Sequence, residues 1–192
     1  AAMNASAAEK ADRSVRTMSQ EDKIGQLMCI GLDGTTFDES QKELVRKYRV
    51  GGIVLDNDNM ESKEQVRAFT KGIRDTANTS SLMPPFIAMN RERMQYRPSL
   101  MLPWTEPKLL SKQGLDAVST LAQRTAIEMR DIGFNLNLGV MVNTHSFYSY
   151  TSDVDRAARI GETITKRYAA NRVFTGYQYF PGGADYTVPG MK

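Results

Sequence analysis

The sequence predicts an α/β fold built on a parallel β-sheet. Short apolar segments alternate with amphipathic segments of ten or more residues, which is the pattern of consecutive βαβ units. The short segments are apolar throughout, as expected for strands that are covered by helices on both faces. Composition agrees with a folded globular chain, because 41% of the 192 residues are hydrophobic and 24% are charged.

The first two units each begin with a helix-capping pattern. Residues 19–22 read Ser-Gln-Glu-Asp and predict a helix start, and the apolar run 28–32 predicts the first strand. Residues 38–41 read Asp-Glu-Ser-Gln and open the second helix. That helix ends at the glycine pair 51–52, and the β-branched run 53–55 predicts the second strand.

The third strand is expected at 86–89, directly after two prolines at 84–85 that interrupt the chain. Ser62 is expected to cap the helix before it, because apolar residues recur three and four positions apart from that point on. A loop containing three prolines is expected between 98 and 107.

The last two units complete the pattern. An amphipathic helix at 115–133 precedes a fourth strand at 134–142. Thr151 or Ser152 is expected to cap the next helix, and the fifth strand is expected at 173–180. Right-handed crossovers would place the five strands in one parallel sheet. Periodicity alone leaves two architectures open, an open doubly wound sheet and part of a barrel.

The rare residues limit the chemistry. Cys29 is the single cysteine and His145 the single histidine, which excludes an internal disulfide and a zinc site built from these residues. Cys29 lies in an apolar run, which predicts a buried and unreactive thiol. The net charge is +3 without a basic stripe, and no glycine-rich phosphate loop follows the first strand. We therefore expect no metal, no cofactor and no nucleic-acid partner.

Residues 1–16 are small and unpatterned, and we expect a flexible N-terminal segment before a single domain at 17–192. The segment has no apolar core of the signal-peptide type, and no run in the chain approaches the ~18 apolar residues of a membrane span. A mature periplasmic or secreted protein is the expectation, with a cytoplasmic protein as the alternative.

Several segments resemble one enzyme family in the expected order. Residues 18–27 read Met-Ser-Gln-Glu-Asp-Lys-Ile-Gly-Gln-Leu, and 50–55 read Val-Gly-Gly-Ile-Val-Leu. Residues 98–101 read Pro-Ser-Leu-Met, 128–137 read Glu-Met-Arg-Asp-Ile-Gly-Phe-Asn-Leu-Asn, and 178–185 read Gln-Tyr-Phe-Pro-Gly-Gly-Ala-Asp. Together they are similar to the glycoside hydrolases of family three, the bacterial β-N-acetylhexosaminidases that recycle cell-wall sugars. The resemblance spans about 17–188 and implies a partial (β/α)8 TIM-barrel-like fold, an incomplete barrel of about five βα units.

The departures from the family pattern fall at the carboxyl ends of the expected strands, where barrel active sites lie. The resemblance implies an Asp where this chain has Asn90, and Asn143 likewise stands in a changed segment. It implies a substrate-clasping Arg at His145, and a Lys-His pair at Gln178 and Tyr179. The resemblance implies an acid/base His after the fifth strand, which has no counterpart here, and a nucleophilic Asp at a seventh strand, beyond Lys192. We therefore expect no catalytic residues.

The uncharged polar and aromatic residues at these positions suggest that the site binds a ligand and does not catalyse a reaction. Amides donate and accept hydrogen bonds without carrying charge, and aromatic rings stack on sugars or line protein interfaces. The alternatives are that the amides satisfy loop backbone, that the aromatics fill vacated space, and that Asp33, Asp56, Asp58, Glu92 and Asp185 include an improvised catalytic pair. The candidate ligand-binding residues are Asn90, Asn143, His145, Gln178, Tyr179 and Asp185.

Three functions follow in order of preference. The first is an inactive family-three homologue that acts as a binding or assembly protein in the cell envelope, by self-association or by binding a protein partner at an open barrel edge. The second is a carbohydrate-binding module for N-acetylglucosamine or muropeptides. The third is a residual β-N-acetylhexosaminidase.

Overall fold

The chain forms a five-stranded parallel sheet with flanking helices, and the sheet does not close into a barrel. The computed structural model describes residues 2–79, 83–91, 105–144 and 149–179, with side chains from Glu9 onward except Lys10. The strand order is β1-β2-β3-β4-β5, so neighbours in sequence are neighbours in the sheet. The strands are β1 (Cys29–Gly31), β2 (Gly52–Val54), β3 (Phe86–Met89), β4 (Leu136–Met141) and β5 (Phe174–Gln178).

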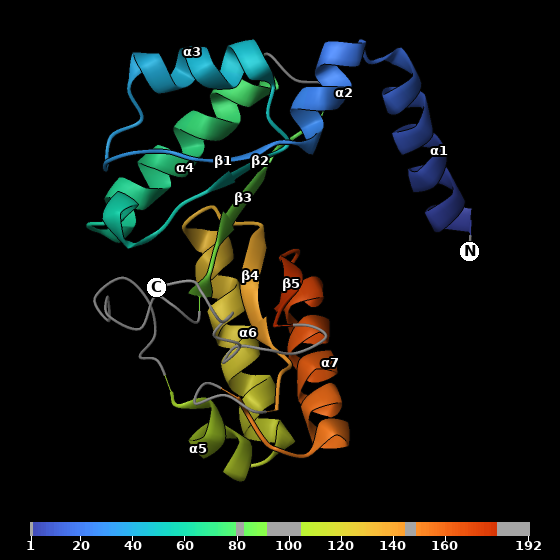
Figure 1. Cartoon of the computed structure of the whole chain (residues 1–192), viewed down its shortest axis with the longest axis vertical. Helices are drawn as coiled ribbons and strands as arrows, with labels where there is room; N and C mark the ends of the chain where they lie inside the picture. Colours follow the sequence, from blue (N-terminus) through green and yellow to red (C-terminus); the bar gives the residue numbers. More distant parts are fainter. Residues whose placement is uncertain (1, 80–82, 92–104, 145–148, 180–192) are drawn as a thin grey trace, which may run out of the picture. The chain divides into compact units, whose positions relative to one another are not determined.

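Helices separate the strands as the expected crossovers require (Figure 1). They are α1 (Ala2–Thr17), α2 (Gln20–Leu27), α3 (Glu39–Tyr48), the short 3-10 helix η1 (Asn57–Asn59), α4 (Lys63–Asn78), α5 (Pro107–Lys112), α6 (Leu115–Asp131) and α7 (Val154–Ala170). Among the described residues, no helix combines the length and apolar character needed to cross a membrane.

The chain divides into two compact units, Ala1–Ile87 and Ala88–Lys192. In unit 1, β1 and β2 pair in parallel, with Ile30 opposite Ile53. The core of this unit consists of buried side chains from β2 and from the inner faces of α3 and α4. They include Val45, Ile53, Leu55, Val66, Phe69 and Ile73.

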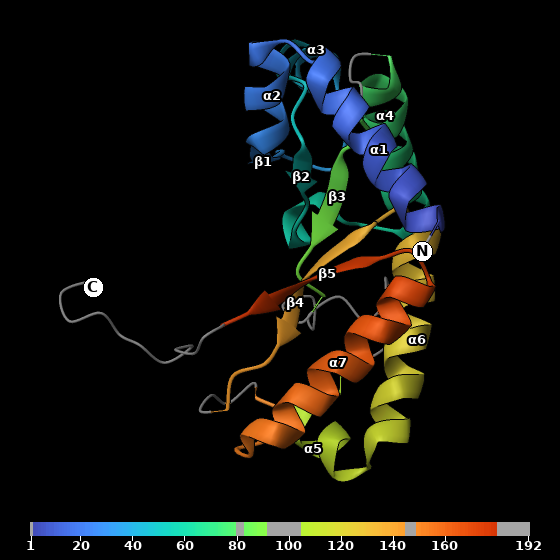
Figure 2. The same cartoon turned by 90° about the vertical axis from the view of Figure 1, so that its right-hand side faces the viewer.

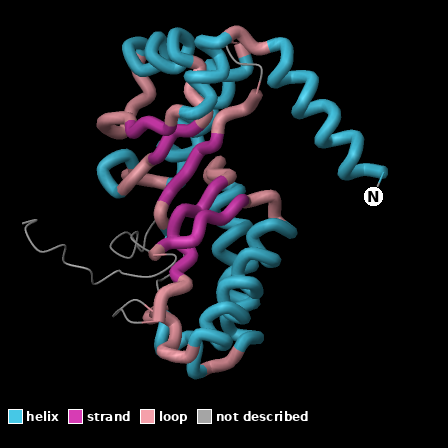
Figure 3. Tube along the Cα trace, turned by 45° about the vertical axis from the view of Figure 1, so that its right-hand side comes forward, coloured by secondary structure: helices cyan, strands magenta, loops and turns pink. Residues whose placement is uncertain are grey.

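In unit 2, β4 pairs in parallel with β3 on one side and with β5 on the other. Helices α6 and α7 lie together on one side of β4 and β5 (Figures 2 and 3). The core between these helices and the strands is mainly apolar and includes a few buried polar side chains. Its members include Met129, Phe134, Val140, Ile160 and Ile164.

The helix caps agree with the sequence in three of four predicted positions. Ser19, Asp38 and Ser62 each accept a hydrogen bond from a backbone N–H in the first turn of their helix, which confirms those predictions. The cap of α7 was expected at Thr151 or Ser152 and is instead Asp153, whose carboxylate accepts from Arg156 N–H at 2.7 Å. Thr151 does not cap the helix itself; its hydroxyl accepts a hydrogen bond from the N–H of the capping residue, Asp153, at 3.1 Å.

Two further features differ from the expectations. Cys29 is exposed, not buried, because β1 is an edge strand that pairs with β2 alone among the described strands. Helix α5 begins at Pro107, the last proline of the expected loop, and continues beyond that loop to Lys112; Pro107 occupies a first-turn position that needs no N–H donor. Residues 2–17 form α1. The flexible segment at 1–16 and the single domain at 17–192 stay predictions.

Candidate functional site

The orientation of side chains at the carboxyl ends of β4 and β5 follows from their contacts with α7. A Cβ atom added to Gly161 in α7 would lie 2.9 Å from Val142 Cγ1 and 3.7 Å from the Tyr177 ring. The Tyr177 hydroxyl also lies 3.1 Å from the Thr165 hydroxyl of the same helix. Val142 and Tyr177 therefore face α7. Because side chains alternate along a strand, Gln178, the neighbour of Tyr177 at the end of β5, faces the opposite side of the sheet.

The Asn90 and Gln178 side chains meet at these strand ends, and Asn143 follows the end of β4 between them in the strand order; we call the three residues the amide cluster. Asn90 Nδ2 donates a hydrogen bond to Gln178 Oε1 at 3.2 Å, which joins the end of β3 to the end of β5 across β4. Val142 N–H donates to the Gln178 carbonyl at 3.5 Å and so places Asn143 beside the end of β5. Asn143 is only 6% exposed, and its Oδ1 accepts no hydrogen bond from the described residues.

The amide cluster offers hydrogen bonds without charge. Each primary amide presents two donors and one acceptor atom, so the three together match ligands that carry hydroxyl and amide groups. A buried acceptor that lacks a partner costs about 1–3 kcal/mol, and a ligand hydroxyl or a water molecule at Asn143 would recover this energy. This arrangement suits recognition of a neutral polar ligand.

Asn137 supports the amide cluster from within β4, and the sequence analysis did not identify it. Its side chain is fully buried, and Oδ1 accepts from Arg91 N–H and from Gly139 N–H, both at 3.1 Å. The strand is irregular at this point, with a register shift between Asn137 and Val140. Asn137 thereby holds the residue after Asn90 against the bulge in β4. An asparagine inside an otherwise apolar strand was the signal that could have found it.

Tyr179 follows β5 directly and adopts a left-handed backbone conformation, with φ of 60°. Such a conformation is uncommon for a residue other than glycine, and it occurs preferentially at functional sites and tight turns. The strained position lies next to the amide cluster, where the sequence analysis predicted a ligand-binding residue.

The other predicted site residues have different outcomes. Asn90 and Gln178 are in direct contact, whereas His145 and Asp185 lie outside the described residues. Of the aromatic residues expected around the site, Tyr177 faces α7 and is not part of it. Tyr150 is buried and lines a small cavity on the helical side with Leu110 and Tyr168 from α5 and α7. Phe147, Tyr148, Phe180 and Tyr186 lie outside the described residues.

Asn59, a second residue that the sequence analysis missed, forms hydrogen bonds with the backbone near the candidate carboxylates of unit 1. Asn59 Nδ2 donates to the Leu32 and Gly34 carbonyls, both at 2.8 Å, and Oδ1 accepts from Asp56 N–H at 2.9 Å. The Asp56 carboxylate in turn accepts from Asp58 N–H at 2.9 Å. Asp56 is thus engaged in the turn that begins η1. Glu92 and Asp185 lie outside the described residues.

The described residues provide neither a metal-binding cluster nor an activated thiol. Among the described residues, no group of three His, Cys, Asp or Glu side chains could hold a metal ion. Cys29 is exposed, and partial desolvation raises the pKa of its thiol above the ordinary value. A raised pKa keeps the sulfur protonated at neutral pH, so Cys29 is a poor nucleophile.

These features define a class of protein: an α/β fold of the barrel type with a polar site at the carboxyl ends of its strands. The chain matches the family described as "Glycosyl hydrolase family 3 N terminal domain" over residues 19–191. The chain therefore belongs to glycoside hydrolase family three, which confirms the resemblance found in the sequence.

Individual relatives agree with this assignment. The chain is 25% identical over 171 residues to β-hexosaminidase A of Pseudoalteromonas piscicida, an alignment that covers 79% of this chain and 28% of that protein. The fold is similar to that of a family-three β-N-acetylglucosaminidase from a Paenibacillus species, with a TM-score of 0.77, 20% identity and coverage of 86% and 34%. A β-N-acetylhexosaminidase from Beutenbergia cavernae gives a TM-score of 0.76, 17% identity and coverage of 86% and 54%. The chain thus spans between about a quarter and a half of the length of these three relatives.

Proposed function

We propose that this chain binds a neutral amino sugar at the amide cluster and does not hydrolyse it. The proposal combines the family membership with the uncharged character of the three amide side chains. Relatives named for N-acetylglucosamine or hexosamine linkages indicate which ligand class to test first. The hydroxyl and acetamido groups of such sugars each pair with amide donors and acceptors.

The hydrogen bond between Asn90 and Gln178 carries the proposal. The resemblance implies Asp and Lys at these two positions, an oppositely charged pair, whereas this chain has two amides 3.2 Å apart. In this chain the two positions are joined by a hydrogen bond between uncharged groups. A site changed in this way keeps its shape and its capacity for neutral hydrogen bonds.

The same exchange argues against hydrolysis. A retaining glycosidase needs one carboxylate as nucleophile and a second group as acid and base on the two sides of the glycosidic bond. In the described part of unit 2, the residues that end β3, β4 and β5 are amides, apolar residues, Arg91 and Tyr179. An amide in place of a carboxylate lacks the negative charge that stabilises an oxocarbenium ion.

Calorimetry with N-acetylglucosamine and chitotetraose tests the binding step. We expect Asn90→Ala and Gln178→Ala each to weaken binding about fivefold to tenfold, because each removes a hydrogen bond worth about 1 kcal/mol. Asn78→Ala is the matched control, since Asn78 is an exposed amide at the end of α4. Equal affinity in all four proteins would contradict the proposed location of the sugar.

A chromogenic N-acetyl-β-glucosaminide tests the absence of hydrolysis. We expect no release of the leaving group above the rate in buffer, even at high protein concentration. Release that disappears on substitution of a single remaining acidic residue would show that the chain is a residual hexosaminidase.

A second function, protein association, is favoured by the surface of unit 1. Along α2 and the start of β1, Ile24, Leu27 and Met28 are large apolar side chains that are 54%, 88% and 44% exposed. Contiguous apolar surface of this kind marks interaction sites. Self-association or docking on an envelope protein would cover it. Light scattering after size exclusion tests the first form, with Leu27→Glu expected to shift any oligomer to monomer.

A further inference from the structure

Unit 2 contains a small cavity on the helical side of the sheet, which shares no lining residue with the amide cluster. The cavity has a volume of about 50 Å³ and is partly open to solvent. Its walls come from Arg91 after β3, from Tyr150, and from α5, α6 and α7. One water molecule needs about 10–15 Å³ of such space, so the cavity has room for a group of about four or five non-hydrogen atoms.

Arg91 brings a positive charge to the lining of this cavity. The residue is only 6% exposed, so solvent screens its guanidinium group weakly and an interaction with an anion is strengthened. Its backbone is fixed to β4, because Arg91 N–H donates to the buried Asn137 Oδ1 at 3.1 Å. A guanidinium group carries five N–H donors in one plane and can bind a carboxylate through two parallel hydrogen bonds.

Hydroxyl groups share the lining with this cation, and acidic groups do not. Thr125, Tyr150 and Tyr168 line the cavity, and each is at most 9% exposed. Their hydroxyl groups can donate hydrogen bonds to an anion. Within the described part of the chain, the cavity has no acidic lining residue. The polar part of the cavity therefore favours a negatively charged group over a positively charged one.

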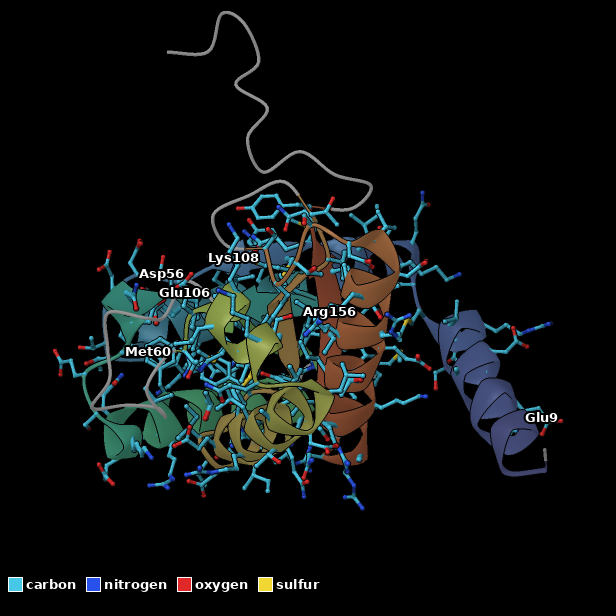
Figure 4. The ribbon with its side chains drawn as sticks, turned by 90° about the horizontal axis from the view of Figure 1, so that it is seen from below. Glu9, Asp56, Met60, Glu106, Lys108 and Arg156 are labelled. Carbon is cyan, nitrogen blue, oxygen red and sulfur yellow. The ribbon has the colours of Figure 1, made fainter. Side chains whose placement is uncertain are left out.

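Glu106 lies next to two lining residues in the sequence but belongs to a different surface. It lines a separate groove together with Lys108 and Arg156. Figure 4 shows Glu106 and Lys108 at α5 and Arg156 on α7. Glu106 thus adds no negative charge to the cavity lining.

The rest of the lining is mainly apolar. Its buried members include Pro107 and Leu110 from α5, Val118 and Ala122 from α6, and Ile164 from α7. Such walls favour a ligand with a hydrocarbon part, because that part leaves water when the ligand binds. A cation, hydroxyl groups and apolar walls in one small cavity together match an aliphatic carboxylate better than an inorganic anion.

Helix α5 forms one wall of the cavity and is held against α7. Arg156 Nε donates to Ser111 Oγ at 3.2 Å, and Arg156 Nη2 donates to the Ser111 carbonyl at 2.5 Å. These two bonds join the first turn of α7 to the end of α5. A wall that is held in place before the ligand arrives reduces the cost of ordering on binding.

We propose that this cavity binds a short aliphatic carboxylate of the size of acetate or propionate. The carboxylate lies against Arg91 and the lining hydroxyl groups, and the hydrocarbon part lies against Val118, Ala122 and Ile164. Acetate has four non-hydrogen atoms and propionate has five, which agrees with the volume of the cavity. The site is separate from the amide cluster and does not depend on the proposed sugar binding.

Propionate and propionamide form a matched pair of ligands for calorimetry, because they have nearly the same shape and differ in charge. We expect propionate to bind about tenfold more tightly at constant ionic strength, since charge-assisted hydrogen bonds are about twice as strong as neutral ones. Inorganic phosphate, which has no hydrocarbon part, should bind more weakly than propionate.

Two variants locate the site. Arg91→Gln removes the charge and should abolish the preference for propionate over propionamide. Ala122→Leu fills the cavity from α6 without changing its charge and should abolish the binding of propionate. Arg159→Gln and Ala158→Leu are the matched controls, since both alter exposed residues of α7 and should bind propionate as the wild type does.

Each outcome supports or overturns the proposal. Equal affinity for propionate and propionamide overturns it, as does the absence of propionate binding at 50 mM ligand. Phosphate binding as tight as that of propionate overturns the assignment to an aliphatic carboxylate. Propionate binding that is unchanged in Ala122→Leu overturns the location, and this variant decides the location by itself if circular dichroism shows that Arg91→Gln is not folded.

Discussion

Asn137 shows how one buried amide can determine the backbone around a site. Its Oδ1 accepts two backbone N–H groups, from Arg91 after β3 and from Gly139 within the bulge of β4. A strand made only of apolar residues would leave both donors without an acceptor. The asparagine therefore satisfies two buried backbone donors at the bulge, while its own Nδ2 is buried and donates to none of the described residues.

We expect Asn137→Ala to lower the free energy of unfolding by about 3 kcal/mol, because a buried donor left unsatisfied costs about 1–3 kcal/mol. Urea unfolding measures the change. Asn78→Ala, in an exposed position, should change the same quantity by less than about 0.5 kcal/mol. A similar small effect at Asn137 would mean that water or a rearranged strand replaces its hydrogen bonds.

At the scale of elements, two glycines allow α2, α3 and β2 to approach one another in unit 1. A Cβ on Gly51 would lie 2.0 Å from the Gln26 carbonyl oxygen, and a Cβ on Gly25 would lie 2.0 Å from the Tyr48 carbonyl oxygen. Gly51 N–H donates to the Gly25 carbonyl at 3.0 Å in the same contact. Since backbone atoms on both sides are fixed by helices, only glycine fits here.

The Gly51→Ala substitution should therefore destabilise the protein by about 3 kcal/mol or more, because the new methyl group overlaps backbone and not a movable side chain. Thermal unfolding monitored by circular dichroism measures the loss. Gly31→Ala is the matched control within β1, since its added Cβ would meet no atom closer than 4.0 Å. Equal melting temperatures for the two variants would refute the close-approach argument.

An ion pair connects two of these helices and predicts a dependence on pH. Arg49, at the end of α3, donates to the Asp22 carboxylate at the start of α2. This hydrogen bond, with further bonds from Ser19, lowers the pKa of Asp22 below its ordinary value of 3.8, although partial desolvation acts in the opposite direction. Because the folded state has the lower pKa, the contribution to stability is present above pH 4 and is lost as pH falls through the folded value.

We therefore expect Asp22→Asn to lower the melting temperature at pH 7, with a difference from wild type that shrinks as the pH falls below 4. Melting curves between pH 2.5 and 7 measure this difference. Glu21→Gln, on the exposed neighbour of Asp22, should give a nearly constant difference across the same range. A difference at Asp22 that grows in acid would have the wrong sign for a lowered pKa.

At the scale of the whole molecule, the fold class could be predicted because buried parallel strands are apolar runs between capped helices. β3 was predicted at its observed residues, and β1, β4 and β5 are shorter than expected. The exposure of Cys29 could not be predicted, since edge position depends on strand order and not on local hydrophobicity. Within the site, the residues Asn90 and Gln178 could be named from the sequence. Their contact could not be predicted from local patterns, because the two residues are 88 positions apart in the chain.

The charge inventory of the molecule gives a final prediction about the proposed site. The amide cluster contains no group that titrates near neutral pH, and His145 is the only histidine in the chain. Histidine is the side chain that ordinarily changes its charge near neutral pH. If the amides carry the binding, affinity for chitotetraose should vary less than about twofold across this range, since hydrogen bonds to neutral amides do not depend on pH. Calorimetry at pH 5.5, 7 and 8.5 measures this, with His145→Gln as the control. A change in affinity centred near pH 6.5 that is absent in His145→Gln would place the imidazole against the sugar and contradict recognition by amides alone.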